Sequence, residues 1–203
     1  YIESTVTEID FAIMQSEYKF DYEVEKVKHA TKRKLPIGFR RLVKNMYEQK
    51  TEWKHVDDYL YGKFKNMVNA LYGMTVQNPI KPVYKYDQET GLLQLDPKAD
   101  AATLSARYLA HGWLPYQIGV WVTAYARLRL EKGLRCIPPE DFLYADTDSI
   151  KFKGDHAAAF EALNKKLLDP EYVAYDKSGK KHPIGIFELD GSYQRFCHMG
   201  AKK

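Results

Sequence analysis

The chain has 203 residues, which is long enough for one domain with a hydrophobic core or for two smaller lobes. Hydrophobic residues make up 45% and charged residues 29%, an ordinary balance for a soluble globular protein. No apolar run approaches the roughly 18 residues that cross a bilayer, so a membrane protein is excluded from the expected classes. The net charge of +4 permits a nucleic-acid partner and disfavours an acidic protein partner.

The N-terminal residues carry no basic segment followed by an apolar one, so we expect no signal peptide. They also lack an initiator Met, and we expect the sequence to be a piece of a longer protein. The two cysteines, Cys136 and Cys197, indicate free thiols in a reducing compartment. The 16 tyrosines suit stacking on bases or sugars, although packing at the edge of a core is their commoner role.

Helical patterns alternate with strand and turn patterns along the chain, and this mixed order predicts the α+β class. Helices are expected at Thr5–Tyr18, from Phe39 onward, at Asp57–Leu71 with Gly73 as the stop, at Gln117–Lys132 and at Ala157–Leu168. Strands are expected at Glu23–His29, at Phe142–Tyr144 and at Ile150–Phe152. Short strands and turns are expected within Asn78–Pro97, and Ile184–Lys203 is expected to be extended.

Two carboxylates, Asp146 and Asp148, stand two residues apart between two predicted strands. In an extended chain such residues project on the same side, so a hairpin tip would present both at a surface. Like charges this close repel unless a cation lies between them, and Mg²⁺ binds through one or two carboxylates plus substrate phosphates. Asp, Thr and Ser are also common in solvated turns, but the apolar flanks favour a fixed strand–turn–strand frame with a metal site at its tip.

The predicted helix before Gly73 carries a second candidate site. Lys65, Asn69 and Tyr72 are spaced i, i+4 and i+7, which places them on one stripe away from the apolar stripe. The Lys would meet phosphate oxygens as a point charge, and the Tyr would pack against a sugar or base. Taken alone, the pattern is more typical of an amphipathic helix whose polar residues lie in water.

Both segments resemble signatures of family B DNA polymerases. Residues 144–149, Tyr-Ala-Asp-Thr-Asp-Ser, are similar to motif C at every specified position. Residues 65–73, Lys-Asn-Met-Val-Asn-Ala-Leu-Tyr-Gly, are similar to motif B and depart from it only at Ala70, where Ser is usual. The departure removes a hydroxyl and the local hydrogen bonding that it would provide.

The resemblance implies a role for each motif residue. Asp148 would ligate two catalytic Mg²⁺ ions, and Asp146 would lie beside it as a supporting member of the metal site. Lys65 would contact the phosphates of the incoming deoxynucleotide, and Asn69 and Tyr72 would complete the nucleotide-binding face near the nascent base pair.

Further segments resemble the protein-primed phage polymerases of this family. Residues 123–127, Thr-Ala-Tyr-Ala-Arg, are similar to a Thr-x-x-Gly/Ala-Arg motif that contacts DNA, which implicates Thr123 and Arg127. Lys202 would be the Lys of a Lys-x-Tyr motif. Residues 7–11 and 38–53 are similar to the stretch between motifs A and B. The implied partners are template–primer DNA, a deoxynucleotide, the remainder of the polymerase chain and, in this group, a terminal protein primer, in the cytoplasm of a bacterial host.

The implied architecture is part of a polymerase palm, an antiparallel sheet with the motif C hairpin, joined to a helical fingers insertion. Residues 1–38 would be a palm segment, residues 39–75 the fingers, and residues 76–203 the palm continuation ending near the thumb. The sequence contains no motif A and no exonuclease motifs, so we expect motif A to precede Tyr1 and the isolated chain to be inactive. Two alternatives remain: a non-catalytic DNA-binding remnant with this fold, and a nucleotide-sugar glycosyltransferase that uses an Asp-x-Asp turn.

Overall fold

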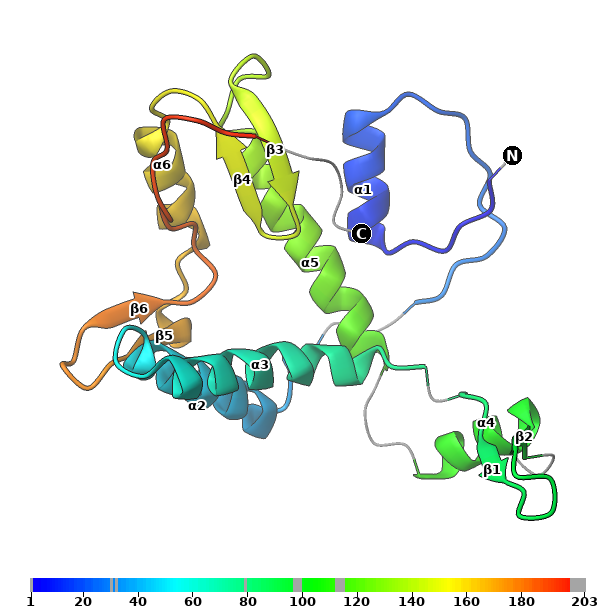
Figure 1. The fold of residues 1–203 in the computed structure, drawn as a ribbon. Coiled ribbons are helices and arrows are strands. Elements are labelled where there is room, and N and C mark those ends of the chain that lie inside the picture. The colour runs from blue at the N-terminus through cyan, green and yellow to red at the C-terminus, as the bar shows by residue number, and fades with distance from the viewer. Residues whose placement is uncertain are drawn as a thin grey trace.

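The computed structural model has mixed α+β architecture, as the sequence predicts (Figure 1). Within the residues that it describes, six α-helices accompany three separate two-stranded antiparallel sheets. Every strand pairs only with its neighbour along the chain, so the larger antiparallel sheet implied by the resemblance is not formed among these residues. The described residues are 2–29, 31, 33–78, 80–96, 100–111 and 116–197.

Two long helices, α2 (Ile37–Trp53) and α3 (Asp58–Thr75), lie side by side as a helical hairpin (Figure 1). His55, in the turn between them, adopts the left-handed conformation with φ 67°, which helps to reverse the chain. Asp57 begins α3, because its side chain accepts a hydrogen bond from the Leu60 backbone N–H at 2.9 Å. The helical character predicted for residues 39–75 is therefore confirmed.

Helix α5 (Tyr116–Leu134) connects this pair to the β3–β4 hairpin, formed by Phe142–Asp146 and Ser149–Phe152 (Figure 1). Glycines mark both contacts. A Cβ at Gly119 would overlap the end of α3, and a Cβ at Gly133 would lie 2.7 Å from side-chain atoms that include Ile150 Cδ1 of β4. Because only glycine leaves room for such close approach, these positions set where α5 meets its neighbours.

We expect Gly119→Ala to lower the free energy of unfolding by about 1–3 kcal/mol, since the new methyl group would overlap the side chains of Val76 and Thr75. Gly62→Ala is the matched control, because Gly62 lies in α3 with nothing within 4 Å of its added Cβ. That variant should be more stable by up to about 1 kcal/mol. Chemical denaturation followed by circular dichroism measures both, and equal stability of the two variants would contradict the close crossing at Gly119.

The base of the β3–β4 hairpin is fixed from a second side by α6 (Ala157–Leu167). Phe160 stacks on Phe152 with ring centroids 5.5 Å apart, and its other neighbour, Phe187, lies 5.4 Å away edge-on. The Asn164 amide bonds both the carbonyl and the N–H of Phe187, at 2.7 and 2.8 Å. The hairpin is thus held between α5 and α6 at the end remote from its turn.

A later hairpin, β5 (Val173–Tyr175) and β6 (Lys181–Pro183), docks on α2. Lys177, in its turn, forms an ion pair with Glu52 and lies 4.7 Å from the Trp53 ring centroid. A short 3₁₀ helix (Pro170–Tyr172) precedes the hairpin. These contacts join the chain after the acidic hairpin to the helical hairpin before it.

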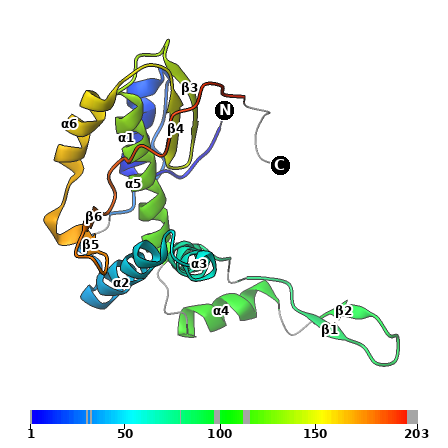
Figure 2. The same ribbon diagram turned by 60° about the vertical axis from the view of Figure 1, so that its left-hand side comes forward.

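The segment between α3 and α5 projects away from the other elements (Figure 2). It contains β1 (Tyr84–Tyr86), β2 (Leu93–Leu95) and α4 (Ala101–His111). Tyr84 pairs with Leu95 and Tyr86 with Leu93, so these four apolar side chains share one face of the hairpin, and all four are exposed.

The chain has a much larger accessible surface than a compact monomer of the same mass. Its accessible surface is 16853 Å², whereas a compact monomer of this mass exposes about 9,800 Å². Among the described residues, the buried apolar side chains are Ala124, Ile137, Val173 and Ala174. None of the described helices has both the length and the apolar character needed to span a bilayer.

Several predicted elements differ from the observed ones. The strand predicted at Glu23–His29 is wrong: its described residues form no strand and have no pairing partner. Helix α3 does not stop at Gly73 but continues to Thr75, whose hydroxyl donates to the Tyr72 carbonyl at 2.7 Å. Helix α4 and the β5–β6 hairpin were not predicted, and residues 184–197 contain no strand.

Candidate functional site

The acidic pair occupies the turn of the β3–β4 hairpin. Asp146 is the last residue of β3 and pairs with Ser149, so Thr147 and Asp148 form the turn between them. The Asp148 N–H donates to the Asp146 carbonyl at 2.6 Å, which closes a three-residue γ-turn centred on Thr147. Thr147 has φ 52°, an uncommon conformation for a β-branched residue. A strained backbone conformation of this kind persists only where the surrounding structure enforces it, and such conformations are concentrated at functional sites.

The two carboxylates differ in their surroundings. Asp146 is half-buried, and its Oδ1 accepts a hydrogen bond from the Thr147 hydroxyl at 2.9 Å, whereas Asp148 is exposed. The Ser149 hydroxyl donates to the Asp146 carbonyl at 3.2 Å. The predicted location of both residues at one hairpin tip is confirmed. That their carboxylates face one groove stays a prediction, because the γ-turn interrupts the strand alternation on which it was based.

The hairpin tip carries two carboxylates, which are the type and number of protein ligands that a hard divalent cation uses. Mg²⁺ takes one or two protein carboxylates and completes its coordination with water and substrate phosphates. In the part of the chain that the structure describes, no group of three or more His, Cys, Asp and Glu side chains is placed to hold a metal ion. That Asp146 and Asp148 hold Mg²⁺ together with donors from the substrate stays a prediction.

The turn of the hairpin points toward the α2–α3 pair, alongside α5 (Figures 1 and 2). On α3, Lys65, Asn69 and Tyr72 are all exposed, as expected for one polar stripe. The Lys65 ammonium group lies 5.8 Å from the centroid of the Tyr61 ring. Ala70 is also exposed, so the absence of the usual Ser leaves no buried hydrogen-bonding group unsatisfied. The nucleotide-binding role of the stripe stays a prediction.

The predicted DNA-binding residues of α5 already have partners. The Thr123 hydroxyl donates within its own helix, to the carbonyls of Val120 at 2.8 Å and Gly119 at 3.2 Å. Arg127 forms two hydrogen bonds with the carboxylate of Asp10, a residue of α1 (Glu8–Glu17). The third predicted DNA contact, Lys202, lies outside the described residues.

The Asp10 carboxylate stabilises the charged form of Arg127. The pKa of the Arg127 guanidinium is raised above its ordinary value, mainly by its hydrogen bonds to Asp10 and further by the negative charge of that carboxylate. Asp10 was not predicted as a site residue. Its signal was the Thr7-x-x-Asp10 spacing, which is typical of a reciprocal helix cap and, by itself, indicates no binding role.

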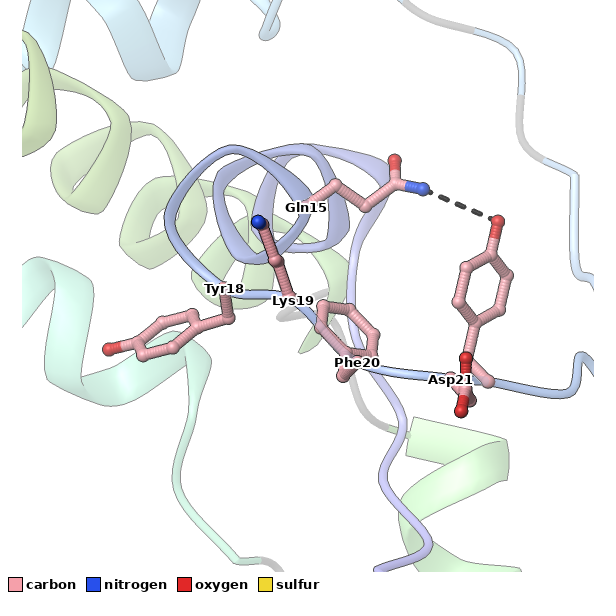
Figure 3. Close-up of a pocket in the computed structure, with 6 residues that line it drawn as sticks. Gln15, Tyr18, Lys19, Phe20 and Asp21 are labelled. Carbon is pink, nitrogen blue, oxygen red and sulfur yellow. Dashed lines mark hydrogen bonds between the residues drawn. The ribbon is translucent and has the colours of Figure 1, made fainter.

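A surface pocket lies at the end of α1, apart from the predicted site residues (Figure 3). Phe20 and Tyr22 line it and also pack on Phe11, with centroids 6.4 and 4.9 Å from that ring. The Gln15 amide donates to the Tyr22 hydroxyl at 3.3 Å. The rings thus fasten the chain after α1 onto that helix, which accounts for their clustering without a ligand.

Comparisons with known proteins identify no relative: no family model, curated protein or solved structure matches this chain. The fold and the site define an α+β chain with an acidic hairpin tip directed toward a helix that exposes Lys, Asn and Tyr.

Proposed function

We propose that this chain is part of a DNA-directed DNA polymerase of family B type, most similar to the protein-primed group. The observation that carries the proposal is the strained Asp146–Thr147–Asp148 turn, which points toward the α2–α3 pair, where α3 carries the exposed residues Lys65, Asn69 and Tyr72. The α2–α3 hairpin would be the fingers. The β3–β4 hairpin with α5 and α6 would be part of the palm, and its remaining strands would come from outside this chain.

The reaction would be the transfer of a nucleotide from a deoxynucleoside triphosphate to a primer 3′ end. Two Mg²⁺ ions, about 3.5–4 Å apart when bound, would supply activation of the 3′-hydroxyl and charge neutralisation on the departing pyrophosphate. Asp148, exposed at the tip, would hold them, and Asp146 would support the turn. Lys65 would stabilise the charge that develops on the triphosphate. Arg127 and Lys202 would hold the backbone of the template–primer.

The open surface supports membership in a larger enzyme. A chain with 16853 Å² accessible, against about 9,800 Å² for a compact monomer, has apolar faces that further polypeptide can cover. The remainder of a polymerase chain would provide that cover, along with motif A.

The chief alternative is a DNA-binding remnant or subunit that keeps the fold without the chemistry, and the absence of motif A from the sequence favours it. The reading frame upstream of Tyr1 separates the two. A motif A there, an Asp followed by a Ser-Leu-Tyr-Pro-like run, supports the polymerase, whereas a natural start at Tyr1 supports the remnant. The exposed Lys–Asn–Tyr stripe argues against the glycosyltransferase alternative, which offers no reason for it.

We expect the purified 203-residue chain to extend no primer with Mg²⁺ and all four deoxynucleotides. Two-metal transfer needs carboxylates from two places, because each ion must be held while it also contacts substrate oxygens. Asp146 and Asp148 come from one hairpin and cannot surround both ions. The assay compares the chain with its Asp148→Ala variant. Robust extension by the parent that is lost in the variant would mean that a complete site exists within these residues.

A further inference from the structure

Asp10 and Arg127 form a geometrically fixed pair between α1 and α5. Arg127 Nε donates to Asp10 Oδ1 at 2.6 Å, and Arg127 Nη2 donates to Oδ2 at 2.9 Å. The Thr7 hydroxyl also donates to Asp10 Oδ2, at 2.8 Å, and accepts from the Asp10 backbone N–H at 3.1 Å. The carboxylate is thus oriented by its own helix cap before it meets the guanidinium.

The two partners differ greatly in exposure. The Asp10 side chain is 14% exposed, whereas the Arg127 side chain is 53% exposed. A guanidinium carries five N–H donors in a planar fork, of which Asp10 takes two. The three remaining donors lie on the part of the guanidinium that Asp10 does not cover, and the Arg127 side chain is exposed enough for them to meet a ligand.

We propose that Asp10 is a positioning residue, which holds Arg127 so that the outer edge of its guanidinium binds a phosphate of the primer–template. The proposal rests on the proposed function and adds to it a residue of α1. When the guanidinium pairs with Asp10 through two hydrogen bonds, its orientation is fixed. Little side-chain entropy is then lost when its remaining N–H groups bind a phosphate.

The opposite role, in which Asp10 competes with DNA for Arg127, is disfavoured by burial. If a phosphate removed Arg127 from Asp10, a carboxylate that is only 14% exposed would lose its cation and keep only the bond from Thr7, which is destabilising. The pair should therefore stay together when DNA binds. The two roles predict opposite changes in DNA affinity when Asp10 is replaced. Loss of a competitor would strengthen DNA binding, whereas loss of a positioning residue would weaken it.

The test measures the affinity of the 203-residue chain for a fluorescent primer–template by anisotropy, between 50 and 200 mM salt. We expect Arg127→Ala to weaken binding about tenfold and to reduce the slope of log affinity against log salt by about 1. Asp10→Asn keeps the shape and an acceptor for Thr7, and should weaken binding roughly three- to tenfold. In the Arg127→Ala background, Asp10→Asn should have no further effect, which a merely structural role of Asp10 would not produce.

The matched control is Glu17→Gln. Glu17 also lies on α1 and pairs at 3.2 Å with Arg135, just beyond α5, so its loss loosens the same contact without touching Arg127. That variant should bind DNA as the parent does. Tighter binding by Asp10→Asn, unchanged binding, or an equal loss in the Arg127→Ala background would overturn the positioning role alone. Failure of the parent to bind DNA, or no effect of Arg127→Ala, would overturn the proposed DNA contact as well.

Discussion

Replacement of Asp148 by alanine is expected to reduce nucleotide incorporation more than about a thousandfold in a polypeptide that joins this chain to the proposed motif A segment. Asp148 is the exposed carboxylate of the hairpin turn, whereas its neighbour Asp146 is half-buried and accepts a hydrogen bond from Thr147. Its loss would remove a shared ligand of both ions, so the attacking and the leaving oxygen would both lose charge stabilisation. Single-turnover incorporation at saturating nucleotide measures the effect.

Two companion variants make this result specific. Asp146→Ala should reduce the rate less than Asp148→Ala, because Asp146 is half-buried and bonded to the Thr147 hydroxyl. Asp155→Ala is the matched control, an exposed acid outside the hairpin that accepts from the Ala157 N–H at the start of α6. It should incorporate nucleotide at the parental rate. Equal rates for the Asp148 and Asp155 variants would remove the hairpin tip from the chemistry.

Replacement of Lys65 by alanine should raise the apparent KM for deoxynucleotide about 10- to 100-fold in the same polypeptide, since a charge-assisted contact to triphosphate oxygens would be lost. Lys63→Ala is its matched control. Lys63 is also exposed on α3 but lies about 160° from Lys65 around the helix axis, so its loss changes the net charge without affecting the stripe. Steady-state kinetics at fixed DNA concentration measure both. A shared shift in KM would indicate a general charge effect and would contradict a specific role for Lys65.

The hairpin was predictable from sequence because its signals are local. Apolar runs flank a short polar turn, and the strands at Phe142–Asp146 and Ser149–Phe152 extend the predicted ones by no more than two residues. The start of α4 also had a local signal that was missed: the Asp100 side chain accepts from the Thr103 N–H at 2.6 Å, an N-cap pattern.

Other features depend on contacts between residues that are distant in sequence. Val24 and Val27 were interpreted as strand residues, but their spacing of three does not fit strand alternation and both are 61% exposed. Helix α3 continues past Gly73 to Thr75, and its end packs against Gly119 of α5, a contact that the local sequence does not reveal. The Asp10–Arg127 pair joins residues 117 positions apart, so no local pattern could reveal it.

Under the proposed function, this chain would carry half of a polymerase site, and an upstream segment would supply the other half. The most direct measurement is primer extension, with Mg²⁺ and four deoxynucleotides, by the 203-residue chain and by the same chain joined to its upstream segment. We expect no extension by the first and template-directed extension by the second, and Asp148→Ala should abolish that extension. Failure of the longer polypeptide to extend a primer, despite tight DNA binding and an upstream motif A, would contradict the account.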